Sequence, residues 1–165
     1  MRRSGYAAII LAAGYSQRMG GFKPLLEIGG RTVTDRLVSS FLSNGVEVVL
    51  VTGWRGEELL AGIEHRGIQT VENPDYEAGM FTSIQAGVRR LSPHHRAFFI
   101  MPVDIPLVRP ETIKRMLEHA SPSPDRVLHP TFCSRRGHPP LIPASLIEEI
   151  LSRPNTGNLR EVLST

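Results

Sequence analysis

Small residues and two cations follow the first apolar run of this chain, and together they suit the binding of an anion. The run Tyr6–Leu11 is short, continuous and β-branched at its centre, which is typical of a buried strand. Leu11 is followed by three small residues that keep side-chain bulk away from a ligand: Ala12, Ala13 and Gly14. A turn of this kind can aim several backbone N–H groups at one phosphate. Arg18 and Lys23 add full positive charge, so the stretch predicts a phosphate-binding loop after a first strand.

Two better-known phosphate loops do not fit this stretch. A Walker loop needs Gly-Lys-Ser/Thr, whereas Lys23 follows Phe22 and precedes Pro24. A dinucleotide fingerprint needs a second glycine two residues after the first, and Gly14 lacks it. The residue types alone leave one alternative, a glycine-containing surface turn with two solvated bases.

A carboxylate follows the most apolar run of the chain. Ala97–Met101 is expected to be a central strand, and Asp104 comes directly after it, between Pro102 and Pro106. A carboxylate fixed at the end of a buried strand is well placed to hold Mg²⁺ against a phosphate. The alternative is an aspartate that serves only the turn.

A third candidate region is the amino end of a helix expected from Gly79 to beyond Gly87. Its free N–H groups carry a positive partial charge, and Thr82 and Ser83 add hydroxyl groups there. The residue types alone fit helix capping equally well.

Four stretches together resemble the nucleotidyltransferases of the molybdopterin cytidylyl- and guanylyltransferase type. They keep the order and spacing of that family and extend over most of the chain, from Leu11 to Pro139. They are Leu11-Ala-Ala-Gly-x-Ser-x-Arg-Met-Gly-x-x-Lys23, Asn73-Pro74 with Gly79 to Gly87, Pro102-Val-Asp104-Ile-Pro106, and Gly137-His138-Pro139. The last stretch is similar to the cytidylyl branch.

The resemblance, with the geometry of the strand ends, gives a set of candidate site residues. The candidate catalytic residues are Arg18, Lys23 and Asp104, with Asp104 as the metal ligand. The candidate nucleotide- or acceptor-binding residues are Leu11, Ala12, Ala13, Gly14, Arg18, Lys23, Thr52, Asn73, Gly79, Ser83, Gly87 and His138. Arg135, Arg136 and His138 are candidates for contacting the phosphate of an acceptor, although a lone histidine is more often structural.

The resemblance implies transfer of a nucleoside monophosphate from a nucleoside triphosphate to a phosphorylated acceptor, with release of pyrophosphate. The expected nucleotide is CTP or else GTP, the expected cofactor is Mg²⁺, and the expected acceptor is molybdopterin. A molybdoenzyme or a fused domain is a candidate partner. The alternatives are a non-catalytic nucleotide-sensing domain and a nucleotidyltransferase that acts on a sugar phosphate or an alcohol phosphate.

One segment departs from the family pattern. Related cytidylyltransferases usually carry Gly-Asp-x-Gly near the end of the chain, and that aspartate helps to hold metal. Here residues 153–160 contain Asn155, Thr156 and Asn158 but no acidic residue. The second metal ligand is therefore left open. Residues 1–165 are expected to be one NTP-transferase domain, either alone or as part of a longer protein.

Alternating strands and helices predict an α/β fold with three layers, in which a mainly parallel sheet has helices on both faces. The resemblance makes it Rossmann-like, of the nucleotide-diphospho-sugar transferase type. Ligands of such sheets lie at the carboxyl ends of the strands, where Leu11, Thr52 and Pro102 fall. The other expected elements are a hairpin at 24–31, helices at 32–43, 57–65, 110–119, 144–151 and 159–163, strands at 47–52 and 68–71, and strands within 127–142 that pack partly outside the first sheet.

Composition and charge limit the classes of partner that the chain is expected to bind. The net charge is +3, with no basic run and no interleaving of aromatic and basic residues, so nucleic acid is not expected. No apolar run approaches the ~20 residues that span a bilayer. Cys133 is the only cysteine, which agrees with a reducing, cytoplasmic compartment. Cys133, His129 and His138 lack zinc-ligand spacing, so zinc is not expected.

Overall fold

A computed structural model describes residues 5–15, 21–65, 67–120 and 125–163. Within these residues a five-stranded sheet has the order β5-β4-β1-β6-β9. The strands are β1 (Tyr6–Leu11), β4 (Glu47–Thr52), β5 (Gln69–Glu72), β6 (Ala97–Pro102) and β9 (Leu141–Pro143). The first four run parallel, and β9 joins the edge of β6 in the antiparallel direction. The predicted α/β class and mainly parallel sheet are confirmed.

Side chains of β1 alternate between the two faces of the sheet, and each face has its own core. Ala8 and Ile10 belong to one apolar cluster, whereas Ala7 and Ile9 belong to the other. All four are fully buried. Burial on both faces explains why this strand is continuously apolar in the sequence. β1 pairs with both β4 and β6 and lies at the centre of the sheet. β6, which was predicted to be a central strand, is an interior strand between β1 and β9.

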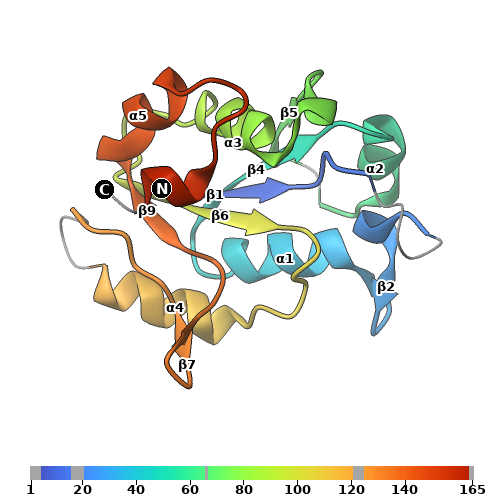
Figure 1. Cartoon of the computed structure of the whole chain (residues 1–165). Coiled ribbons are helices and arrows are strands. Elements are labelled where there is room, and N and C mark those ends of the chain that lie inside the picture. Colours follow the sequence, from blue (N-terminus) through green and yellow to red (C-terminus); the bar gives the residue numbers. More distant parts are fainter. Residues whose placement is uncertain (1–4, 16–20, 66, 121–124, 164–165) are drawn as a thin grey trace.

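Helices cover both faces, as expected (Figure 1). On one face lie α1 (Val33–Leu42), α2 (Gly56–Gly62) and α4 (Pro110–His119). On the other lie α3 (Met80–Val88), α5 (Ile147–Ser152) and α6 (Leu159–Val162). None of the described helices is long and apolar enough to cross a membrane.

Two small hairpins stand apart from the main sheet. The first, β2 (Glu27–Ile28) with β3 (Arg31–Thr32), is the hairpin predicted after Pro24. Its turn residues Gly29 and Gly30 both have positive φ angles, which glycine adopts without strain. The second, β7 (Thr131–Phe132) with β8 (Arg135–Arg136), projects beneath α4 in Figure 1. The described residues also form three short 3-10 turns: η1 (Lys23–Leu25), η2 (Tyr76–Ala78) and η3 (Ala144–Leu146).

A buried carboxylate explains why α2 ends earlier than the predicted residue 65. The Asp35 side chain, 1% exposed, accepts hydrogen bonds from the backbone N–H groups of Glu64 and His65. It also accepts one from the Thr32 hydroxyl at the start of α1. Burial raises the pKa of Asp35, but these hydrogen bonds outweigh it and hold the pKa below its ordinary value. Asp35 therefore joins the start of α1 to the chain after α2.

Candidate nucleotide site

A cavity of about 390 Å³ opens at the carboxyl edge of the sheet. The ends of β1 and β6, the turn η1 and the start of α3 all contribute to it. Its lining includes eight of the predicted site residues: Leu11, Ala12, Ala13, Gly14, Lys23, Gly79, Ser83 and Asp104. The structure thus brings three separate predicted segments to one place.

Backbone hydrogen bonds fix the loop after β1. The Ala12 N–H donates to Val51 O at 2.9 Å, and the Trp54 N–H donates to Ala13 O at 3.1 Å. A Cβ added to Gly14 would meet no heavy atom of the described protein within 4 Å. Gly14 therefore leaves open space in the cavity wall, which suits the close approach of a ligand to the backbone.

Buried neighbours set the position of Lys23, which lies in the turn η1 and is half-buried. Phe22 before it packs edge-on against Trp54, with ring centroids 5.7 Å apart. Pro24 after it is buried, and its carbonyl accepts the Thr34 hydroxyl at 2.7 Å. Contacts of Phe22 and Pro24 thus fix the turn that bears Lys23, so less backbone ordering would be needed for Lys23 to bind a phosphate.

Asp104 lies in the tight turn that follows β6. The Ile105 N–H donates to Pro102 O at 3.2 Å, which closes this turn. The Val103 N–H donates to Leu11 O at 3.1 Å, which ties the turn to the end of β1. The Asp104 side chain is exposed and lines the cavity, so its oxygens are available to a cation or a substrate.

The start of α3 forms the opposite wall of the cavity. Gly79 precedes the helix with φ +115°, a conformation that favours glycine. Buried Asn73 holds the first turn, because its amide group donates to the hydroxyls of Thr82 at 2.8 Å and Ser83 at 2.9 Å. The free N–H groups of this helix end thus reach the cavity beside Ser83.

The sequence matches a known family over nearly its whole length. The family model described as the MobA-like NTP transferase domain matches residues 8–165. The chain belongs to this family.

Two curated relatives are similar to this chain in sequence, and one solved structure is similar to it in fold. It is 31% identical to the molybdenum cofactor cytidylyltransferase of Escherichia coli K12, over 97% of the chain and 81% of that protein. It is also 31% identical to the nicotine blue oxidoreductase of Paenarthrobacter nicotinovorans, over 87% of the chain and 74% of that protein. The crystal structure of Rv0371c from Mycobacterium tuberculosis H37Rv shares the fold, with a TM-score of 0.81 at 24% identity, over 93% of this chain and 78% of that one. Relatives of similar identity thus include a cytidylyltransferase and an oxidoreductase, so family membership alone does not fix the reaction of this chain.

Among the described residues, four predicted site residues do not line the cavity: Thr52, Asn73, Gly87 and His138. Thr52 is buried at the end of β4, and its backbone carbonyl accepts a hydrogen bond from the Asn73 N–H. The Asn73 side chain is also buried and donates to the hydroxyls of Thr82 and Ser83. His138 is exposed, and neighbouring Pro140 accepts a hydrogen bond from the Ile100 N–H of β6 at 3.4 Å. Arg18 lies outside the described residues.

Packing against the sheet requires glycine at position 87. Gly87 lies inside α3, where an added Cβ would come within 2.4 Å of Ile9 Cγ2 and 3.1 Å of Val51 Cγ2. Glycine at this position lets the helix lie close to β1 and β4. The contact of Gly87 with a nucleotide stays a prediction.

An aromatic and acidic wall of the cavity was missed by sequence reasoning. It comprises Tyr15, Tyr76, Glu77 and Met80. The Tyr15 hydroxyl donates to the Glu77 carboxylate across the cavity wall, and this hydrogen bond raises the pKa of Tyr15 above its ordinary value. Tyr15 also packs against Trp54 and Tyr76, with ring centroids 5.6 and 5.4 Å away. Its place inside the first motif was the available signal.

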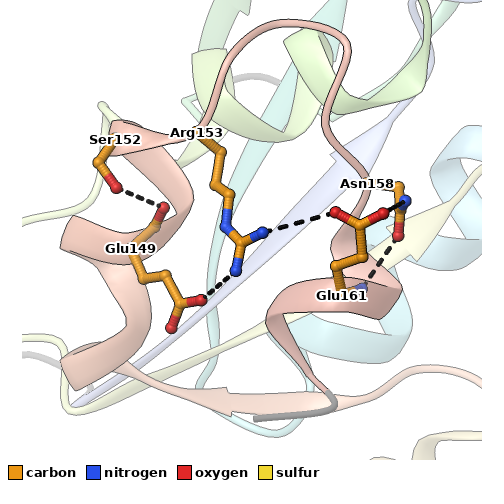
Figure 2. Close-up of polar contacts among 5 residues, drawn as sticks. All are labelled: Glu149, Ser152, Arg153, Asn158 and Glu161. Carbon is orange, nitrogen blue, oxygen red and sulfur yellow. Dashed lines mark hydrogen bonds and ion pairs between the residues drawn. The ribbon is translucent and has the colours of Figure 1, made fainter.

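The segment that lacks the expected acidic residue connects α5 to α6, and its ends are joined by charged groups (Figure 2). Arg153 donates to Glu149 at 2.6 Å and to Glu161 at 3.5 Å. Asn158 caps α6 by accepting the Glu161 N–H at 3.0 Å. Both glutamates are thus partnered with Arg153, and neither lines the cavity. Among the described residues, Asp104 and Glu77 are the acidic residues that do line it.

Within the described residues, one group of three potential metal ligands converges, formed by Glu47, His94 and His95. It lies where β4 begins, at the opposite edge of the sheet from the cavity. His95 Nδ1 accepts the Ser92 N–H at 3.0 Å, so the proton of the neutral ring lies on Nε2, 3.1 Å from Glu47. A histidine that binds metal usually donates its other ring N–H. Hydrogen bonds therefore satisfy His95 without an ion, and none of the three residues lines the cavity.

The environment of His95 makes stability depend on pH. Burial lowers its pKa below the ordinary value of about 6.5, although Glu47 acts in the opposite direction. The unfolded chain then binds the proton more readily, so this contribution is full above about pH 6.5 and is lost as pH falls. We expect the excess stability of the wild type over His95→Gln to shrink between pH 7.5 and pH 5 in urea unfolding. The exposed His119→Gln serves as control, and a constant or growing excess would contradict the assignment.

Proposed function

We propose that this chain transfers a nucleoside monophosphate, CMP, from CTP to a phosphorylated acceptor, molybdopterin, and releases pyrophosphate. The observation that carries the proposal is the convergence of the Ala12–Gly14 backbone, Lys23 and Asp104 on one cavity. Exposed backbone N–H groups of small residues and one cation suit the phosphates of a nucleoside triphosphate, and one carboxylate suits the metal ion that accompanies them. The relationship to the cytidylyltransferase of Escherichia coli supports CTP and molybdopterin as substrates.

The proposed reaction is an in-line displacement at the α-phosphorus. An acceptor phosphate oxygen forms a new bond to that phosphorus while the bond to the β-bridging oxygen breaks, and pyrophosphate leaves with the electron pair. A phosphate monoester is largely ionised at pH 7, since its second pKa is about 6, so a general base is not needed. Catalysis then consists of positioning and charge stabilisation.

The described side chains divide these tasks. The Ala12 N–H is engaged by Val51 O, so the N–H groups of Ala13 and Gly14 are the ones proposed to hold the β- and γ-phosphates. Lys23 offsets the negative charge that develops at the α-phosphate. Gly79 and Ser83 present the start of α3 to the base and ribose. Arg18 is proposed to join the β- and γ-phosphate contacts.

Asp104 is the proposed Mg²⁺ ligand. An exposed carboxylate in the cavity wall offers the hard oxygen donor that Mg²⁺ prefers, and a single protein carboxylate with substrate phosphates and waters is an ordinary magnesium shell. When bound, Mg²⁺ neutralises phosphate charge.

A basic segment near the carboxyl end of β6 is the proposed contact for the acceptor phosphate. The Gly137 N–H donates to Pro130 O at 2.8 Å, which brings the residues beside Gly137, Arg136 and His138, close to the segment of His129. Burial lowers the pKa of His129, and the charges of Arg136 and His138 lower it further. The hydrogen bond between Ile100 and Pro140 keeps this segment beside β6, which leads to Asp104. A concentration of positive charge there would attract a phosphorylated acceptor.

Ligand-dependent stabilisation tests nucleotide choice. With Mg²⁺ present, CTP is expected to raise the melting temperature more than GTP, UTP or ATP. A ligand at 100 times its dissociation constant adds about 2.7 kcal/mol to the free energy of unfolding. A larger shift with GTP would assign the chain to guanylyl transfer instead, and a shift with none of the four would count against nucleotide binding.

The second candidate function is nucleotide sensing without catalysis. The absence of an acidic residue in 153–160 favours it, because a sensor needs the phosphate loop but not a full metal shell. Retention of Lys23 and Asp104 in one cavity favours the enzyme. A sensor would bind the nucleotide and release no pyrophosphate with any acceptor, whereas a sugar-phosphate or alcohol-phosphate nucleotidyltransferase would release it with a different acceptor.

A further inference from the structure

A second groove lies outside the nucleotide cavity, between α1 and the segment Pro106–Pro110 that leads from β6 to α4. Its volume is about 610 Å³. No residue lines both the groove and the cavity. A ligand of the groove would therefore occupy a separate site.

The polar lining of the groove is cationic and hydroxylic. It consists of Arg31, Arg36, Arg109, Ser39, Ser40 and Ser43, and no acidic residue contributes to it. None of the three arginines forms an ion pair with a carboxylate of the described residues. Asp35, the acidic residue of α1, is buried and bound to Thr32 and to backbone N–H groups beyond α2. The positive charge of the groove is thus not neutralised by its own surroundings.

Hydrogen bonds hold the walls of the groove in place. The Arg31 guanidinium donates to Ser39 Oγ at 2.6 Å and lies 3.3 Å from His65 Nε2. Ser40 Oγ lies 3.0 Å from Arg36 O and 3.4 Å from Val108 O, which joins α1 to the opposite wall. Asn44 Nδ2 donates to Ser40 O at 2.9 Å and to Pro110 O at 3.1 Å at the far end. The arginines therefore extend from a preformed frame.

We propose that this groove binds the phosphate group of a small anionic metabolite. Guanidinium groups form paired hydrogen bonds with phosphate oxygens. Because the serine hydroxyls already bond within the frame, Arg36 and Arg109 are the groups left to bind the anion. A volume of this size suits a small molecule, since ligand pockets commonly span roughly 300–1,000 Å³. Ser40 Oγ and Val108 O, 3.4 Å apart, join the two walls, which favours a compact anion over an acidic segment of a partner protein.

The test is amide NMR of the ¹⁵N-labelled chain titrated with inorganic phosphate or with glycerol 3-phosphate at constant ionic strength. Saturable shifts are expected at Ser39, Ser43 and Val108 with either probe. Tighter binding of glycerol 3-phosphate would identify a phosphomonoester as the ligand, and equal binding would identify free phosphate.

Two variants locate the binding. Arg36→Gln with Arg109→Gln is expected to weaken it by about tenfold or more, because each loses a charge-assisted hydrogen bond. Lys23→Ala should leave the groove shifts unchanged, which separates this site from the nucleotide cavity. Both variants should keep the wild-type amide dispersion elsewhere. The proposal fails if the groove shifts are absent, are reproduced by chloride, persist unchanged in the double variant, or arise only with an oligoglutamate peptide.

Discussion

Asp104→Asn is expected to abolish turnover while leaving weak nucleotide binding. The substitution keeps the size of the side chain but removes the charge that would hold Mg²⁺ at the cavity. Metal stabilisation of transition-state charge is worth several kcal/mol, so kcat should fall by about 10³-fold. Binding should persist through the loop that contains Gly14 and through Lys23, because these groups do not depend on the metal. Pyrophosphate release and equilibrium binding of CTP measure the two effects separately.

A matched control and a magnesium titration sharpen this prediction. Glu111→Gln removes an exposed carboxylate from the first turn of α4 and should keep wild-type turnover. Because residues 153–160 supply no second carboxylate, the wild type should need an unusually high Mg²⁺ concentration for half-maximal rate. Full activity of Asp104→Asn would contradict the proposal that Asp104 holds Mg²⁺.

Lys23→Ala is expected to lose most transferase activity with the fold intact. A charge-assisted hydrogen bond to phosphate is worth about 1.5–3 kcal/mol, which corresponds to a loss of roughly 10- to 100-fold in kcat/KM. The fold should survive because Lys23 lies in a turn whose buried contacts come from Phe22 and Pro24. Lys114→Ala is the natural control, since Lys114 is the other lysine of the chain and lies exposed on α4. Near-wild-type turnover of purified Lys23→Ala would be incompatible with the proposed phosphate contact.

The main strands could be predicted from the sequence because a strand buried on both faces has apolar residues at consecutive positions. β1, β4 and β6 are continuously apolar, and each lies within about one residue of its predicted range. The end of α2 was not predictable from local pattern, because it depends on Asp35, about 30 positions earlier. The antiparallel pairing of β9 depends likewise on a contact between Leu141 and Phe99.

In the site, too, residues within motifs could be predicted, whereas contacts between residues far apart in the sequence could not. Gly14, Lys23 and Asp104 could be predicted because each sits directly after an apolar strand or inside a motif, and the structure places all three in one cavity. Gly87 does not line this cavity, and its packing against Ile9, on a strand far away in the sequence, could not be predicted from the motif. Glu77 was missed because nothing in its own segment indicates that Tyr15, 62 positions away, meets it across the cavity wall.

Transfer of label from CTP that carries ³²P at the α-phosphate tests the central claim most directly. The purified chain is incubated with this CTP, Mg²⁺ and molybdopterin, and the labelled products are separated. The account predicts that label moves to the acceptor, one unlabelled pyrophosphate is released for each transfer, and Asp104→Asn produces neither. If the chain binds a nucleotide but transfers no label from any of the four triphosphates, at any Mg²⁺ concentration and with a competent acceptor, the catalytic account is contradicted and nucleotide sensing takes its place.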